Sequence, residues 1–119
     1  NNKSKSLSSS KILILGLAYK KDVEDMRESP SITIMELLRS FGSDVDYSDP
    51  YIPEFPPMKH HHFDLSSVEI TEENLLRYDA VVLATNHDKF DYSLILEHSR
   101  ILVHCRGVYS EDNHNIVKA

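Results

Sequence analysis

Short continuous apolar runs are the feature of this sequence that most limits its fold. Residues 11–16 read KILILG, residues 79–85 read DAVVLAT and residues 100–105 read RILVHC. Short runs of Val, Ile and Leu that do not alternate with polar residues are typical of strands buried on both faces, as in parallel sheets. Residues 43–50, SDVDYSDP, predict a further strand that ends at Asp49.

Helix signals lie between these runs. Ser29 and Pro30 are typical of an N-cap and a first-turn proline, and Gly42 predicts the end of that helix. Thr71 caps a second helix, and residues 91–99 predict a third. At i, i+3, i+4 and i+7, the apolar face of the first helix is formed by Ile34, Leu37, Leu38 and Phe41.

Alternating strands and helices predict an α/β fold, a Rossmann-like three-layer domain with a mainly parallel sheet and helices on both faces. We expect one domain over residues 11–119, long enough for a sizeable core but short for an enzyme that holds both cofactor and substrate. Residues 1–10, NNKSKSLSSS, predict a linker or disordered arm. Residues 50–70, rich in proline and histidine, predict a loop with a short strand near 67–70.

Charge and composition argue against several classes of function. The formal net charge of −6 argues against general affinity for nucleic acid or an anionic membrane. No apolar run approaches the roughly 18 residues of a membrane span, and the polar N-terminus is not a signal peptide. The single cysteine, Cys105, allows no internal disulfide and indicates a reducing, cytoplasmic setting.

Ligands of parallel α/β sheets bind outside the carboxyl ends of the strands. In this sequence the candidate residues that follow strands are Tyr19, Lys20, Lys21, Asp49, Asn86, His87 and Arg106. Two lysines and an arginine at one edge, beside the N-terminus of the first helix, predict a site for phosphate or carboxylate. Arg106 would bind an anion through two hydrogen bonds, and Lys20 would act as a point charge.

Each candidate also has a structural interpretation. The adjacent lysines are compatible with plain solvated charges, and Arg27 lies among acids with which it can brace the loop. Asp49 and the proline after it are also compatible with a simple turn. His87 is either a helix-capping partner or a site residue. The run HHH at 60–62 lacks zinc-type spacing, and consecutive residues of an extended segment point to opposite sides, so we expect a loop without a metal.

The turn after the first strand argues against two ligand classes. A dinucleotide site requires G-x-G-x-x-G there, whereas GLAYKK places Leu17, Tyr19 and Lys20 where the backbone would have to approach a pyrophosphate. We therefore expect no NAD bound in this chain. A phospho-receiver domain requires an acidic pair after the first strand, which here ends in glycine.

Four segments closely resemble the C-terminal, UDP-binding domain of the UDP-glucose/GDP-mannose dehydrogenase family. They are KILILGLAYKKDVEDMRESPSITIMELL, YSDPYIP, YDAVVLATNHDKFDY and ILVHCRGVY, and the resemblance runs over about residues 10–117. The block GLAYKKDVEDMRESP is the most specific of them. The segments YSDP and ITEENL are most similar to the UDP-N-acetylglucosamine 6-dehydrogenase branch.

The resemblance implies an NAD-dependent oxidoreductase of polysaccharide biosynthesis that oxidises the C6 alcohol of a UDP-sugar to a carboxylate, through a thioester on a catalytic cysteine. In the family, NAD binds an N-terminal domain, and the cysteine lies in a Gly-Gly-x-Cys-x-Pro motif. This chain contains neither, so Cys105 does not inherit that role, and we expect no catalytic residue and no turnover in the chain alone. The full protein is expected to add NAD-binding and central domains and to form a homo-oligomer.

Three positions inherit a ligand-binding role through the resemblance. Tyr19 and Lys20 match the aromatic-Lys-Lys-Asp block, and Arg106 matches the arginine after the last strand, which in relatives reaches the sugar nucleotide. His104 and Cys105 depart from the usual aspartate and small residue before that arginine. We expect the two cations to be neighbours at one edge of the sheet. The alternative is an interaction module that closes the cleft and supports oligomer contacts without touching substrate.

Overall fold

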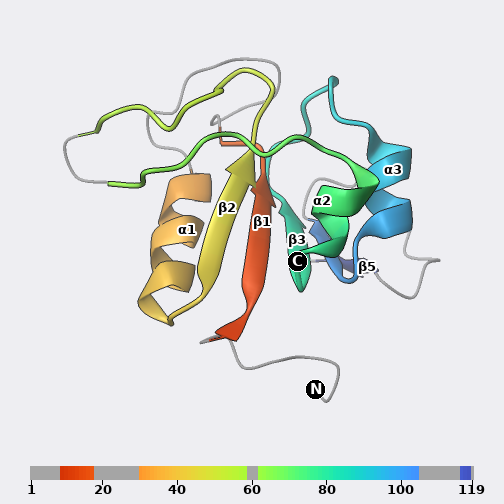
Figure 1. Ribbon diagram of the computed structural model, residues 1–119, viewed down its shortest axis with the longest axis horizontal. Helices are drawn as coiled ribbons and strands as arrows, with labels where there is room; N and C mark the ends of the chain where they lie inside the picture. Colours follow the sequence, from red (N-terminus) through yellow and green to blue (C-terminus); the bar gives the residue numbers. More distant parts are fainter. Residues whose placement is uncertain (1–8, 18–29, 59–61, 105–115, 119) are drawn as a thin grey trace.

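The computed structural model describes residues 9–17, 30–58, 62–104 and 116–118. In this part of the chain five parallel strands form one sheet in the order β2-β1-β3-β4-β5. The strands are β1 (Lys11–Leu15), β2 (Asp44–Ser48), β3 (Ala80–Leu83), β4 (Leu102–His104) and β5 (Ile116–Lys118). The helices are α1 (Pro30–Ser40), α2 (Glu72–Leu76) and α3 (Tyr92–His98) (Figure 1).

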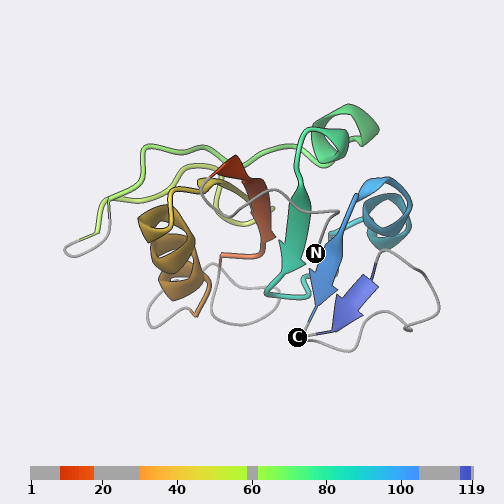
Figure 2. The same ribbon diagram turned by 90° about the horizontal axis from the view of Figure 1, so that it is seen from below.

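Helices cover both faces of the sheet, with α1 on one side and α2 and α3 on the other (Figure 2). Successive side chains of a strand point to opposite faces. Ile12 and Ile14 of β1 therefore pack in the cluster with α1, whereas Leu13 and Leu15 pack in the cluster with α2 and α3. This arrangement confirms the predicted three-layer α/β fold.

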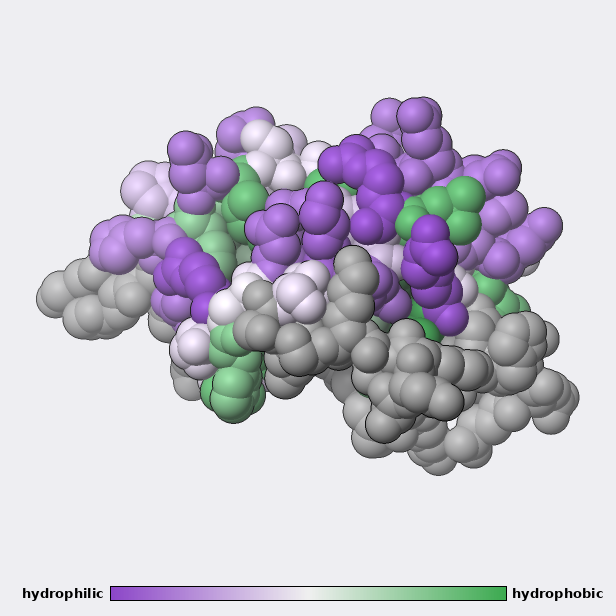
Figure 3. All heavy atoms as spheres, turned by 60° about the horizontal axis from the view of Figure 1, so that its bottom comes forward, coloured by the Kyte–Doolittle hydropathy of each residue, from purple (hydrophilic) through white to green (hydrophobic). Residues whose placement is uncertain are grey.

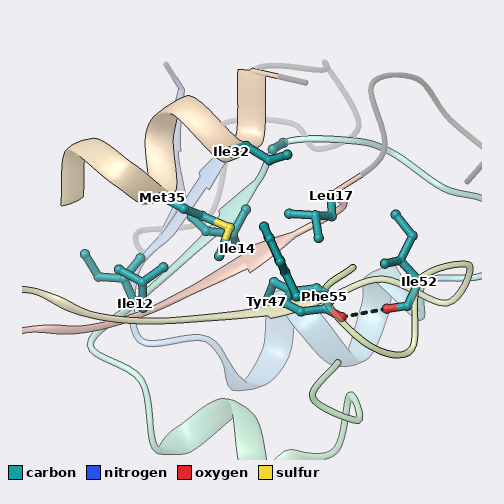
Figure 4. Packing of buried hydrophobic residues seen from close by; sticks show 10 residues of the cluster. Ile12, Ile14, Leu17, Ile32, Met35, Tyr47, Ile52 and Phe55 are labelled. Carbon is teal, nitrogen blue, oxygen red and sulfur yellow. Dashed lines mark hydrogen bonds between the residues drawn. The ribbon is translucent and has the colours of Figure 1, made fainter. Parts of the chain in front are cut away.

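The α1-side cluster combines strand, helix and loop side chains (Figure 4). Its labelled members are Ile12, Ile14, Leu17, Ile32, Met35, Tyr47, Ile52 and Phe55. The Tyr47 hydroxyl donates a hydrogen bond to the carbonyl oxygen of Ile52 at 2.8 Å, so the phenol is satisfied inside the core. Burial raises the pKa of Tyr47, and the negative charges of Glu54 and Asp49 add to the shift.

The start and end of α1 are as predicted, and its buried face is confirmed in part, because Ile34 and Leu38 pack against the core as expected. The helix begins at Pro30, and Gly42 adopts a φ of 90° just beyond its end. The predicted inward residues Leu37 and Phe41 are 56% and 54% exposed. The helix instead turns Ser31, Ile32 and Met35 toward the sheet. Ser31 can point inward because its hydroxyl donates to the Gly16 carbonyl oxygen at 2.7 Å.

The remaining elements confirm some local signals and correct others. Thr71 caps α2 by accepting a hydrogen bond from the Asn74 N–H. The expected short strand near 67–70 is absent from that segment, and an isolated bridge joins Glu54 to Ser66 instead. The sequence also places its last strand at residues 100–105, whereas β5 follows β4 at the edge of the sheet. Three residues are too few to show a strand pattern.

The surface drawn in Figure 3 is largely hydrophilic in the described residues, and hydrophobic side chains form separate small patches there. Among the described helices, α1 is the longest with 11 residues. No helix in those parts of the chain has the length and apolar character to cross a bilayer.

Candidate functional site

The strand order reverses beside β1. From β1 the chain passes to β2 on one side, and it later returns to place β3 on the other side. In open α/β sheets, ligands bind outside the carboxyl ends of the strands at such a switch point. The described segments that leave the strands there begin at Gly16 after β1, at Asp49 after β2 and at Ala84 after β3.

Gly16 lets the ends of β1 and β3 approach closely. Its φ is 93°, and a Cβ at this position would lie 2.4 Å from the Cβ and 2.7 Å from the carbonyl oxygen of Thr85. Its N–H donates to the Ser48 carbonyl oxygen at 2.8 Å, which ties β1 to the end of β2. The space that its missing side chain leaves is thus occupied by Thr85. The glycine serves strand packing and does not form a cradle for a pyrophosphate.

A buried carboxyl group, that of Asp49, joins the three segments that leave the strands. The residue is 1% exposed. One carboxyl oxygen, Oδ2, accepts the Leu17 N–H at 2.7 Å and lies 2.9 Å from Nε2 of His87. The other, Oδ1, accepts the Tyr51 N–H at 2.8 Å. Leu17 follows β1, Asp49 and Tyr51 follow β2, and His87 follows β3, so one side chain links all three segments.

His87 is enclosed by aromatic rings. Its side chain is fully buried, and its ring centroid lies 4.9 Å from that of Tyr51 and 5.6 Å from that of Phe90. The Tyr92 hydroxyl donates to the His87 carbonyl oxygen at 2.5 Å. On the outer side, the Lys89 ammonium lies 4.7 Å from the centroid of the Tyr51 ring. These contacts fix the position of the imidazole beside Asp49.

The described residues that flank the segment 18–29 lie at this same edge. Leu17, just before it, is held by the Asp49 carboxyl group, and Ser31, just after it, donates to the Gly16 carbonyl oxygen. The N-terminus of α1 therefore lies next to the end of β1. The positive end of the helix dipole therefore lies at this edge.

The structure places two of the predicted site residues. Asn86 is half-buried, and His87 is fully buried and bonded to Asp49. The other predicted residues, Tyr19, Lys20, Lys21 and Arg106, lie outside the described residues, as do Arg27 and Cys105. The expectation that Lys20 and Arg106 are neighbours therefore stays a prediction.

Sequence reasoning named Asp49 as a candidate after the second strand, with a simple turn as the alternative, but it did not predict the contacts of Asp49 with Leu17, Tyr51 and His87. The available signal was an acidic residue directly after a predicted strand, at the edge where ligands bind. The partner, His87, is 38 positions away in the chain, so local spacing could not pair the two.

The described residues that follow position 61 in the 50–70 loop pack back on α1. Arg39 donates to the His62 carbonyl oxygen at 2.8 Å, and its guanidinium lies 3.8 Å from the centroid of the Phe63 ring. Phe63 in turn contacts Phe55 with 5.2 Å between ring centroids. In the described residues, no group of three or more His, Cys, Asp and Glu side chains is placed to hold a metal ion. His60 and His61 lie outside those residues.

Residues 13–111 match the family described as UDP-glucose/GDP-mannose dehydrogenase family, UDP binding domain. The UDP-N-acetyl-D-mannosamine dehydrogenase of Methanococcus aeolicus is 34% identical over 80 residues, which are 67% of this chain and 16% of that protein. The UDP-glucose 6-dehydrogenase of Haloferax volcanii is 31% identical over 84 residues, 71% of this chain and 19% of that protein. The chain thus spans less than a fifth of the length of these two relatives.

The fold is also shared with solved structures. The NDP-N-acetyl-D-galactosaminuronic acid dehydrogenase of Methanosarcina mazei superposes with a TM-score of 0.72 at 24% identity, covering 99% of this chain and 26% of that chain. The UDP-D-ManNAc dehydrogenase of Pyrococcus horikoshii superposes with a TM-score of 0.68 at 24% identity, covering 95% of this chain and 25% of that chain. At this identity the likeness shows the fold alone.

Proposed function

Because the chain belongs to the UDP-glucose/GDP-mannose dehydrogenase family as its UDP-binding domain, we propose that it is the nucleotide-sugar-binding lobe of an NAD-dependent UDP-sugar 6-dehydrogenase. The match over residues 13–111 is the observation that carries this proposal. The reversal of strand order beside β1 supports a site at the carboxyl edge of the sheet.

The ligand of this lobe is a UDP-sugar, and its diphosphate is the group that cations recognise best. In our proposal Lys20 and Arg106 bind the diphosphate, Tyr19 packs on the ligand, and Lys21 and Asn86 lie at the margin of the site. The N-terminus of α1 at the same edge adds partial positive charge. His87 is buried beside Asp49, which suits a supporting role for its side chain.

We place the NAD site in another domain of the full protein. When bound, NAD accepts the hydride that leaves the sugar C6 atom. In this chain the space beside Gly16, the glycine of the first strand end, is filled by Thr85, which does not fit a pyrophosphate held against the backbone. No step of the oxidation is therefore assigned to residues of this chain.

The wider setting follows the same proposal. We assign residues 11–119 to the domain and residues 1–10 to a linker. We further propose that the full protein adds NAD-binding and central domains, forms a homo-oligomer and works in the cytoplasm. The branch of UDP-N-acetylglucosamine 6-dehydrogenases stays a prediction, because the relatives described above carry other sugar names.

Calorimetric titration of the chain with UDP, UDP-N-acetylglucosamine and NAD tests the proposal. We expect weak binding of UDP and its sugar and none of NAD. Lys20→Ala removes one charge-assisted hydrogen bond, worth about 1.5–3 kcal/mol, and should weaken UDP binding about 10- to 100-fold; Arg106→Ala removes two and should weaken it at least as much. In the full enzyme the same variants should raise KM for the UDP-sugar.

The chain offers matched controls. Lys11 begins β1 and Arg100 precedes β4, so both exposed cations lie at the opposite, amino edge of the sheet. Lys11→Ala and Arg100→Ala should leave UDP binding unchanged. If Lys20→Ala and Arg106→Ala behaved like these controls, the site assignment would be wrong. Absence of UDP binding to every form, in the chain and in the full enzyme, would favour the interaction module instead.

A further inference from the structure

Asp49 and His87 form a fully buried pair of ionisable side chains, and removing such groups from water costs free energy. Both side chains are 0% exposed, and Nε2 of His87 lies 2.9 Å from Oδ2 of Asp49. Well-packed apolar residues in place of such a pair are often as stable or more stable. A role beyond stability is therefore worth seeking, and the contacts of the carboxyl group indicate which one.

The carboxyl group sets the backbone of two segments at the ligand-binding edge. Its oxygens accept the N–H of Leu17 and the N–H of Tyr51, which belong to the segments after β1 and β2. Two N–H donors and an imidazole nitrogen thus surround the two oxygens of this buried carboxyl group. A shift of this side chain would therefore move the start of both segments together.

Asp49 is itself held in two places, at its backbone and at its side chain. The Asp49 N–H donates to the Ser67 hydroxyl at 2.8 Å, and that hydroxyl donates to the Asp49 carbonyl oxygen at 3.2 Å, so the backbone of Asp49 is fixed. The direction of its side chain is set by His87, whose ring is held between Tyr51 and Phe90. His87 thus controls the carboxylate that Leu17 depends on.

We propose that Asp49 and His87 are a positioning pair for the UDP-sugar, which fixes the backbone at the end of the first strand through the N–H of Leu17. This inference rests on the proposed function, because Tyr19 and Lys20 are two and three residues beyond Leu17. Small displacements of a binding group weaken binding strongly, and supporting hydrogen bonds prevent them. Neither residue needs to touch the ligand.

Two variants of similar polarity, His87→Gln and His87→Asn, distinguish the effect of the hydrogen bond to Asp49 from the effect of having any polar side chain at position 87. In His87→Gln the side-chain amide can reach the position of Nε2 and still donate to Asp49. In His87→Asn the amide is too short to do so. We expect His87→Asn to weaken UDP binding about tenfold and to speed amide-proton exchange at Leu17 and Tyr51, whereas His87→Gln should recover most of both.

A destabilised variant at a distance controls for a merely structural effect. Leu75 of α2 is fully buried in the cluster on the other face of the sheet. Leu75→Ala should lower stability at least as much as His87→Asn, yet leave UDP affinity and the exchange of the Leu17 amide unchanged while the protein is folded. If His87→Asn and His87→Gln bound UDP as the wild type does, the positioning role would be refuted and the proposed function would stand.

Failure of the proposed function is distinguishable from failure of this inference. If the wild type did not bind UDP, the proposed function would fail, and amide exchange at Leu17 would still test the pair. Equal exchange in wild type, His87→Asn and His87→Gln would then overturn the inference. Should His87→Asn fail to fold, Asp49→Asn, which replaces one acceptor oxygen by a donor, should show the same pattern of fast exchange.

Discussion

Replacing Gly16 with alanine should destabilise the protein more than an ordinary glycine substitution. The added Cβ would lie 2.4 Å from the Cβ of Thr85, 2.7 Å from its carbonyl oxygen and 2.8 Å from its nitrogen. Two of these three atoms belong to the backbone and cannot rotate away. Gly16 also has a φ of 93°, a conformation that residues with a Cβ rarely adopt.

The magnitude follows from three terms. A left-handed backbone costs alanine about 1–2 kcal/mol relative to its ordinary conformations, and overpacking costs about 1–3 kcal/mol. Alanine also restricts the unfolded chain, which offsets about 0.4–1 kcal/mol. For Gly16→Ala we therefore expect a loss of about 2–4 kcal/mol in the free energy of unfolding, measured by urea denaturation followed by circular dichroism.

Gly42 is the matched control for this prediction. It has a φ of 90° like Gly16, but it is exposed beyond the end of α1. Gly42→Ala should therefore carry only the backbone terms, about 1 kcal/mol. The difference between the two variants measures the contact of Gly16 with Thr85. Equal losses, within about 0.5 kcal/mol, would refute the close approach of the ends of β1 and β3.

Three further predictions concern packing and ionisation. Met35→Ala should cost about 2–5 kcal/mol in the free energy of unfolding because Met35 is fully buried, whereas Phe41→Ser, at a 54% exposed position, should cost less than about 1 kcal/mol; denaturation curves that reversed this order would contradict the observed face of α1. Burial, and secondly the hydrogen bond to Asp46, raises the pKa of Tyr78 above the ordinary value of 10.0. The unfolded chain therefore loses this proton first, so stability should fall as pH rises above about 10. Tyr78→Phe should flatten that decline in a pH series of melting temperatures, and an unchanged slope would count against the assignment.

Much of the fold could be predicted because its signals are local. The apolar runs of β1, β3 and β4 can be recognised without knowledge of their partner strands. The first-turn proline Pro30 and the cap Thr71 likewise act within one turn of their own helices. The buried face of α1 could be predicted only in part, as Ile34 and Leu38. It depends on how the helix lies on the sheet, and on the Gly16 carbonyl oxygen that accepts the hydroxyl of Ser31. The strand β5 has three residues, too few for a pattern.

The position of the candidate site could be predicted from the sequence, but the hydrogen bonds between its residues could not. Parallel strands alone place the residues that follow them at one edge, which was enough to select His87 and Asn86 as candidates. The contact between Asp49 and His87 joins residues that are 38 positions apart in the chain, and no local sequence pattern near either residue predicts it. The resemblance of the segments around the strands to a known family was confirmed by the match over residues 13–111.

The central claim, that a UDP-sugar binds at the carboxyl edge of the sheet, is tested most directly by amide chemical shifts of the labelled chain during titration with UDP. We predict that the amides of Leu17 and Asn86 shift in proportion to bound UDP, while two amides at the amino edge do not move: that of Lys11, which donates to the Asp79 carboxyl group, and that of Asp79, which donates to the Lys11 carbonyl oxygen. Shifts confined to Lys11 and Asp79, with none at Leu17 and Asn86, would contradict it.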